Sequence, residues 1–214
     1  MKLKTAIFVY AACGVVFLLC LVPALTGCFQ AAELAVFRAL CPAKGSFYSA
    51  FLKAITLLGN WKSAVLIAAL LLAVPKRGFR LKIALPAAAT ALFSVALNEC
   101  IKALVARARP AVALLSERGF SFPSGHAMNN GALYLTLFLL ANRYLKKGPL
   151  KTAVLCLLGL LPVLIAFSRV ALGVHYLSDV LAGLAVGLAL AVTAFQITVK
   201  NMGALQAAAQ KNAE

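Results

Sequence analysis

The chain has 214 residues, of which 64% are hydrophobic and 12% are charged, and its mean hydropathy is +0.97. A soluble globular domain is about half apolar and carries about twice this share of charge, so the composition excludes a soluble fold and indicates an integral membrane protein. The net charge of +16 would suit nucleic-acid binding, but most cations lie in short breaks between apolar runs, which is typical of membrane topology signals.

Six apolar runs predict an all-α bundle of six transmembrane helices. A spanning helix needs about 17–25 residues, and flanking residues can extend the shorter runs. Pro86 and Pro162 fall inside two runs, which membrane helices tolerate. The runs are Thr5–Thr26, Asn60–Pro75, Ile83–Ile101, Ala127–Ala141, Thr152–Phe167 and Tyr176–Val199.

The remaining segments are expected to lie outside the membrane core. Residues 30–58 are too broken to span, but Phe47, Phe51, Ile55 and Leu58 recur at helical spacing. They predict an interfacial helix on the outer face between helices one and two. Residues 1–200 then form one membrane domain, and residues 201–214 a short polar cytoplasmic tail.

The first run has a second interpretation. Lys2 and Lys4 before an apolar run resemble a signal peptide, and Leu25–Cys28 fits a bacterial lipobox. Cleavage there would leave five spans, whereas an uncleaved helix keeps an even number. A disulfide between Cys28 and Cys41 is open, because an oxidising compartment would permit it and sequence cannot show its geometry.

Alternate loops differ in positive charge. The positive-inside rule places one set in the cytoplasm together with both termini. That set contains Lys2, Lys4, Lys76, Arg77, Arg80, Lys82, Arg143, Lys146, Lys147, Lys151, Lys200 and Lys211. The outer set has nine cations, and its last five surround both histidines, which suggests that they bind a ligand. The outer set contains Arg38, Lys44, Lys53, Lys62, Lys102, Arg107, Arg109, Arg118 and Arg169.

Three polar stretches interrupt the apolar chain, and the helix count places all of them at outer helix ends. They are KALVARARP (Lys102–Pro110), PSGH (Pro123–His126) and SRVALGVHYLSD (Ser168–Asp179). Three cations, Lys102, Arg109 and Arg169, would be costly to desolvate together unless an anion compensates. Arginine forks match phosphate oxygens, and lysine adds a point charge.

The other polar residues suit phosphate chemistry. Ser124 and Gly125 precede a helix that begins near His126, and a helix start with free N–H groups is a natural phosphate cradle. His175 and Asp179 are four residues apart, so on a helix they share a face. A carboxylate on one ring nitrogen fixes the tautomer and leaves the other free as a nucleophile. His126 could protonate a leaving oxygen.

The order and spacing of these stretches resemble the three-part signature of the type 2 phosphatidic acid phosphatase superfamily: K-x6-RP, PSGH and SR-x5-H-x3-D. The resemblance implies a magnesium-independent enzyme without cofactor or metal, acting on a lipid phosphate in a membrane. It implies that His175 becomes a phosphohistidine, Asp179 orients it and His126 is the acid. The implied phosphate-binding residues are Lys102, Arg109, Ser124, Gly125 and Arg169.

The resemblance leaves the substrate open. An outer-face site in a bacterial cytoplasmic membrane suits undecaprenyl pyrophosphate, phosphatidylglycerophosphate or phosphatidic acid. The alternatives are a lipid phosphotransferase, a lipid A phosphatase or a non-catalytic phospholipid-binding relative. The soluble vanadium haloperoxidases of the same superfamily need a large helical domain that this chain lacks. The oligomeric state is not predicted.

Several residues have competing interpretations. His126, His175 and Asp179 could be zinc ligands, although nearby cations would repel a metal. We expect Arg107 and Arg118 to be exposed flanking charges, and Glu99 to pair with Lys102 three residues later.

The sixth run contains a GxxxG motif, formed by Gly183 and Gly187. Such a motif lets two helices approach closely. We expect it to serve packing within the bundle in preference to a dimer interface.

Overall fold

In the computed structural model, which describes residues 3–211, the chain is helical and the described residues contain no strand. The elements are α1 (Leu3–Thr26), α2 (Gln30–Leu40), α3 (Phe47–Leu58), α4 (Trp61–Ala73), α5 (Arg77–Phe79), the π-helical turn η1 (Arg80–Ala84), α6 (Leu85–Val105), α7 (Gly125–Tyr144), α8 (Pro149–Ala171) and α9 (Leu177–Lys211). The predicted all-α class is confirmed. Lys2 and the last three residues of the predicted tail lie outside the described range.

Four helical stretches are long and apolar enough to cross a membrane: α1, the stretch Arg77–Val105, α8 and α9. A fifth results if α3 and α4, which bend by 52° at their junction, form one broken span. The predicted run at Asn60–Pro75 becomes α4, which has only 13 residues. The run at Ala127–Ala141 becomes α7, which is not among the candidate spans because polar side chains interrupt it.

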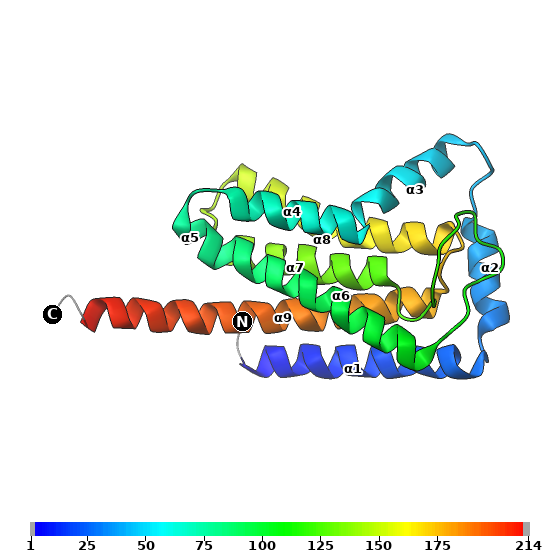
Figure 1. Ribbon diagram of the computed structural model, residues 1–214, viewed down its shortest axis with the longest axis horizontal. Helices are drawn as coiled ribbons and strands as arrows, with labels where there is room; N and C mark the ends of the chain where they lie inside the picture. The colour runs from blue at the N-terminus through cyan, green and yellow to red at the C-terminus, as the bar shows by residue number, and fades with distance from the viewer. Residues whose placement is uncertain (1–2, 212–214) are drawn as a thin grey trace.

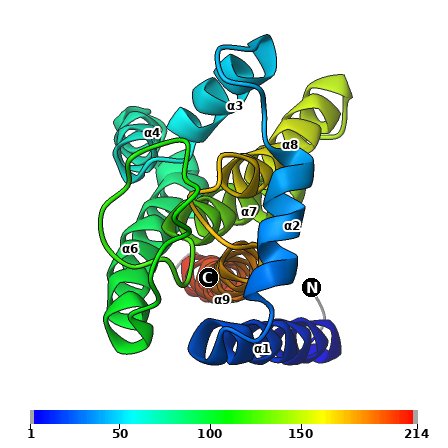
Figure 2. The same ribbon diagram turned by 90° about the vertical axis from the view of Figure 1, so that its right-hand side faces the viewer.

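Helix α7 lies at the centre of the bundle, where it contacts α4, α6, α8 and α9 (Figure 2). Its buried residues include Asn129, Asn130 and Thr136, which other helices shield from lipid. The amide of Asn130 donates to the backbone oxygens of Gly59 (2.6 Å) and His126 (2.7 Å). A central helix needs no apolar outer surface, which explains why α7 is the most polar of the long helices.

The segment between α1 and α4 holds two helices, where the sequence predicted one. Helix α2 crosses the end of the bundle, and after a loop α3 runs obliquely to its junction with α4 (Figure 1). Ser46 caps α3 by accepting from the N–H of Ser49, and Asn60 caps α4 by accepting from that of Lys62. Cys28 and Cys41, on either side of α2, are both free thiols.

The two glycines of α9 pack against α7. A Cβ atom at Gly183 would lie 2.7 Å from the backbone oxygen of Ser124, and one at Gly187 would lie 2.7 Å from that of Met128. The two backbones are therefore in direct contact, and the prediction of packing within the bundle is confirmed. Beyond the bundle α9 continues alone to Lys211, so most of the predicted tail is helical (Figure 1).

Candidate active site

The three polar stretches meet at the end of the bundle that α2 crosses. They lie at the end of α6, at the start of α7 and across the junction of α8 with α9 (Figure 1). There they surround a cavity of about 380 Å³. Its walls include five of the eight predicted site residues: Lys102, Arg109, Gly125, His126 and His175. The other three, Ser124, Arg169 and Asp179, are buried behind that wall.

The His175 ring has a defined tautomer. Its Nε2 lies 3.2 Å from Nη1 of Arg109, which can only donate, so Nε2 accepts and carries no proton. Its Nδ1 therefore bears the hydrogen and faces Oδ2 of Asp179 at 3.5 Å. Because Nε2 keeps its lone pair at the cavity wall, His175 has the orientation of a nucleophile.

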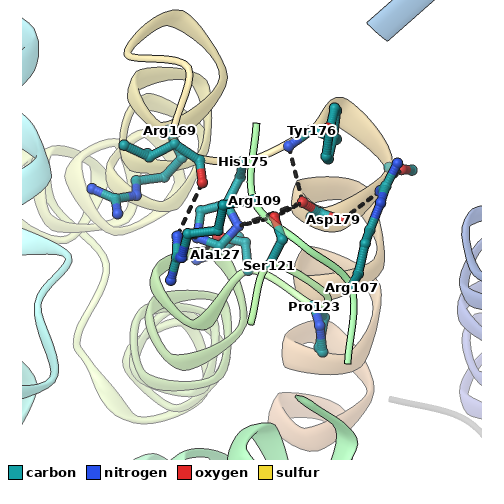
Figure 3. Close-up of polar contacts among 12 residues, drawn as sticks. Arg107, Arg109, Ser121, Pro123, Ala127, Arg169, His175, Tyr176 and Asp179 are labelled. Atoms are coloured by element: carbon teal, nitrogen blue, oxygen red, sulfur yellow. Dashed lines mark hydrogen bonds and ion pairs between the residues drawn. The ribbon is translucent and has the colours of Figure 1, made fainter. Parts of the chain in front are cut away.

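The Asp179 carboxylate is fully buried and receives donors on both oxygens. Oδ2 accepts from the hydroxyl of Ser121 and from the N–H of Tyr176 (2.9 Å), and Oδ1 accepts from Nη1 of Arg107 at 2.6 Å. Figure 3 shows Asp179 between Arg107 on one side and Ser121 and His175 on the other. The carboxylate is therefore held in one orientation towards the imidazole.

Burial lowers the pKa of His175 from 6.5 to about 4, and the hydrogen bond that His175 donates to Asp179 offsets only part of this effect. The ring is therefore neutral at physiological pH, as a nucleophile requires. Burial also lowers the pKa of Arg109, whose guanidinium remains charged.

The start of α7 forms the second wall. Ser124 is the N-cap, and its hydroxyl accepts from the N–H of Ala127 at 3.5 Å. Its own N–H donates to the backbone oxygen of Asp179 at 2.9 Å, so it is already engaged. Within residues 3–211, nothing accepts from the N–H of Gly125 or His126, which remain available to an anion. A Cβ at Gly125 would lie 2.9 Å from the Asn98 amide oxygen, so only glycine fits here without a shift.

The guanidinium of Arg169 is 1% exposed and partly satisfied. It donates from Nη1 to the hydroxyl of Thr56 at 2.6 Å and from Nη2 to the carboxylate of Glu117. Its Nε has no partner in the described part of the chain. Burial raises the pKa of Glu117, but the charge and hydrogen bond of Arg169 outweigh burial and hold this pKa below its usual range.

Two expectations about charged residues have different outcomes. Glu99 pairs with Lys102 as predicted, at 3.3 Å, and is exposed. Arg118 is exposed as predicted, but Arg107 is buried, which corrects the expectation that it is a flanking charge. The reason is a left-handed residue, Ala106 (φ 51°), which ends α6 and turns the chain so that Arg107 points at Asp179.

Sequence reasoning missed several residues in contact with the site, four of which bear on its chemistry. Ser121 and Arg107 bind Asp179, Glu117 binds Arg169, and Asn98 lines the cavity beside Gly125. Arg107 lies at a variable position inside the stretch Lys102–Pro110, and Ser121 lies two residues before PSGH, so the available signal was proximity to the motifs. Within residues 3–211, no three His, Cys, Asp or Glu side chains are grouped as metal ligands.

The fold and the site define a membrane-embedded helical bundle in which a histidine–aspartate pair borders a cation-lined cavity. The PAP2 superfamily model matches residues 83–203, and the chain belongs to this superfamily. Over 98 residues it is 43% identical to phosphatidylglycerophosphatase B of Bacillus subtilis (strain 168). That match covers 44% of this chain and 47% of the relative, so the aligned part spans about half of the relative's length.

Two solved structures share the architecture. A transmembrane PAP2-type phosphatidylglycerolphosphate phosphatase from Bacillus subtilis superposes with a TM-score of 0.75 at 28% identity, covering 89% of this chain and 96% of that one. Aquifex aeolicus LpxE superposes with a TM-score of 0.58 at 22% identity, covering 78% and 94%. The second likeness concerns the fold alone.

Proposed function

We propose that this chain is a metal-independent membrane phosphatase that hydrolyses a lipid phosphomonoester or diphosphate through a phosphohistidine on His175. One observation carries the proposal: His175 lines the cavity with Nε2 placed to accept from Arg109, while its Nδ1 faces the carboxylate of Asp179. This arrangement pairs a nucleophile with an orienting group beside donors suited to phosphate. The domain comprises residues 1–200.

The phosphate would lie against donors from three parts of the chain. Lys102 and Arg109 line the cavity, and the N–H groups of Gly125 and His126 start α7. Arg169 would offer its unpartnered Nε. These donors would stabilise the charge on the equatorial oxygens as phosphorus passes from the lipid to His175.

The first step forms an N–P bond from the Nε2 lone pair as the P–O bond to the lipid breaks. The bonding electrons go to the leaving oxygen, which takes a proton from His126, and His126 therefore enters this step as imidazolium. The phosphorylated ring of His175 is cationic and is stabilised by Asp179. In the second step a water oxygen attacks phosphorus and gives a proton to His126, and the N–P electrons return to Nε2. Both histidines are then restored.

The membrane arrangement is part of the proposal. Six spans would be α1, α4, the stretch Arg77–Val105, α7, α8 and α9, with α2 and α3 on the outer face. The cavity would open on the extracytoplasmic side of a bacterial cytoplasmic membrane, and both termini would be cytoplasmic. The many cations of the loops at the opposite end of the bundle support this orientation.

A lipid substrate is supported by an apolar groove between α4 and α6. The groove has a volume of about 180 Å³ and is lined by alanine, valine and leucine side chains. Trp61 and Val95 border both this groove and the cavity, so a chain lying in the groove would place its phosphate at His175. Phosphatidylglycerophosphate is the first candidate because both named Bacillus relatives are phosphatases of that lipid.

A phosphate-release screen tests the proposal. Purified protein would be given phosphatidylglycerophosphate, undecaprenyl pyrophosphate and phosphatidic acid, with His175→Gln as the matched inactive control. We expect release from at least one lipid by the wild type and none by the variant. Transfer of phosphorus to an added lipid acceptor in place of water would identify a phosphotransferase. Release from no lipid, or equal release by both proteins, would contradict the proposal.

A further inference from the structure

A buried ion cluster links α2 to the candidate nucleophile. The side chain of Arg107 is 7% exposed and has partners on two helices. Its Nη1 donates to Oδ1 of Asp179 (2.6 Å) and to the hydroxyl of Ser178 (2.8 Å), both on α9, and its Nη2 donates to Oε2 of Glu33 (2.7 Å) on α2. The guanidinium also lies over the Tyr176 ring at 4.0 Å. These contacts hold the Arg107 guanidinium in one position.

Glu33 completes the cluster from the other side. It is 7% exposed, and its Oε1 accepts from both the N–H (2.9 Å) and the hydroxyl of Ser178. Because its charge is compensated by these donors, the Glu33 carboxylate can remain buried in a fixed position. Since Ser178 directly precedes Asp179, Glu33 fixes the backbone next to the group that orients His175.

The loop backbone reinforces the same point. The backbone oxygen of Arg107 accepts from the N–H of Ser121 at 2.8 Å, and the hydroxyl of Ser121 donates to Oδ2 of Asp179. The two oxygens of Asp179 are thus held by two residues of one loop that are joined to each other. A shift of Arg107 would move both contacts.

The net charge of the cluster determines how strongly Asp179 attracts a positive charge on the His175 imidazole. A single arginine bound to Asp179 would draw most of its charge away from the imidazole. Here Arg107 is shared with Glu33, so the three groups carry a net charge of −1 next to the ring. The pKa of Arg107 reflects this sharing, since burial lowers it but Asp179 and Glu33 together raise it above its ordinary value.

We propose that Arg107 and Glu33 are positioning residues, which hold the Asp179 carboxylate against Nδ1 of His175 and set how strongly it attracts the imidazolium formed during phosphoryl transfer. This inference rests on the proposed role of His175 as nucleophile. Arg107 is one of the variable positions of the K-x6-RP motif, Glu33 lies outside all three motifs, and the two residues are 74 positions apart.

The other charged groups around His175 stay constant in the test. Arg109 and Glu117 face it from the loop between α6 and α7, and Arg169 faces it from α8. His126 lines the same cavity from α7. Changes confined to Glu33 and Arg107 therefore report on the cluster alone.

The experiment compares Glu33→Gln, Arg107→Gln and the double variant with Arg38→Gln, an exposed cation on α2 that serves as the matched control. Each single variant should lower kcat about 10–100-fold with little change in KM, by analogy with the loss of groups that orient metal-binding histidines. The control should keep wild-type kcat.

The pH dependence separates positioning from folding. Removing the negative Glu33 disfavours imidazolium, so the acidic limb of kcat/KM should move to lower pH by about one unit. Removing the positive Arg107 should move it to higher pH by a similar amount. The double variant restores the charge balance and should return near the wild-type midpoint. Loss of activity in all variants without any movement of the midpoint would overturn the inference.

A second readout does not depend on the lipid substrate. Diethyl pyrocarbonate acylates neutral imidazole, and mass spectrometry resolves His175 from His126, so the labelling rate against pH gives the midpoint of His175 directly. The same opposite shifts are expected there. If no lipid is hydrolysed but the labelling midpoints move as stated, the proposed function fails while the positioning stands. If Arg107→Gln does not fold, the test depends on Glu33→Gln alone. A labelling midpoint of His175 that moves to lower pH in this variant supports the inference, and an unmoved midpoint refutes it.

Discussion

The guanidinium of Arg169 is bound to the carboxylate of Glu117, so an acid from the loop between α6 and α7 occupies one of its donors. Glu117 lines the cavity, whereas Arg169 is 1% exposed behind it. A carboxylate and a phosphate oxygen use the same arginine fork. A phosphate that binds Arg169 therefore has to displace Glu117 or share the guanidinium with it.

Glu117→Gln should strengthen the binding of inorganic phosphate and vanadate about tenfold, because the amide gives up Arg169 more readily and removes a negative charge. Inhibition constants against a hydrolysed lipid would measure this. Glu99→Gln is the comparison, since Glu99 is exposed and its pair with Lys102 contributes less. Equal or weaker inhibition of Glu117→Gln than of the wild type would show that Glu117 does not compete with the anion.

His175→Ala should abolish turnover, and His126→Ala should reduce kcat by about 10²–10⁴-fold, the usual contribution of a general acid–base group. Acid-quenched protein should carry phosphate on His175, found by mass spectrometry of the peptide. Circular dichroism in detergent would confirm that both variants fold. Substantial turnover by His175→Ala would rule out the phosphohistidine route.

Activity should persist in excess EDTA, because the proposed chemistry uses arginine, lysine and histidine where other phosphatases use a metal. Vanadate should inhibit, since it can take the five-coordinate geometry of the transition state on Nε2 of His175. Phosphate release with and without chelator measures the first point. Loss of activity in EDTA that zinc or magnesium restores would favour a metal site.

Protonation of His175 should destabilise the protein in acid. Its pKa is about 4 in the folded state and 6.5 when unperturbed, so the unfolded chain binds the proton first as pH falls. Stability should therefore be complete above about pH 6.5 and decline towards pH 4, by about 3 kcal/mol for this group. Detergent unfolding of the wild type and His175→Gln across that range would measure the difference. A constant difference between the two proteins would contradict the expectation.

The proposed sidedness predicts opposite labelling of two positions. In a cysteine-free variant, Ser116→Cys should react with an impermeant thiol reagent in intact cells, because the loop between α6 and α7 lies outside. Lys147→Cys, between α7 and α8, should react only after the membrane is opened. Both side chains are exposed in the folded protein. The reverse pattern would place the site in the cytoplasm and remove outward-facing lipid carriers from the substrate list.

Much of the site could be predicted because its signals are local. Spacing predicts that His175 and Asp179 lie near each other, which they do, although His175 precedes α9 and the two do not share a helix face as predicted. The turn before His126 predicts the start of α7, which begins at Gly125. The burial of Arg107 could not be predicted, since it depends on the left-handed Ala106 and on Glu33, a residue 74 positions away. Local patterns carry no information about such distant partners.

The number of membrane-spanning helices was hard to predict for a different reason. Hydropathy assumes that a spanning helix faces lipid, but α7 is enclosed by its neighbours and can carry Asn129, Asn130 and Thr136. Helix α2 was missed although Val36 and Leu40 give it a short apolar face that packs against the core, and it is also held by Glu33, which bonds to Ser178 of α9. The burial of α7 among its neighbours and the bond between Glu33 and Ser178 therefore determine features that sequence periodicity does not predict.

The contact between α7 and α9 gives the site an unusual sensitivity to added atoms. Gly183 lies against the backbone oxygen of Ser124, one residue before the N–H groups offered to phosphate, and four residues after Asp179 on the same helix. A single methyl group at position 183 would stand 2.7 Å from that oxygen and 3.1 Å from the Cβ of Ala127. The start of α7, which carries the proposed acid His126, would then be pushed away from the helix that carries Asp179. The alignment of α7 with α9 at the site thus depends on the absence of a side chain at position 183.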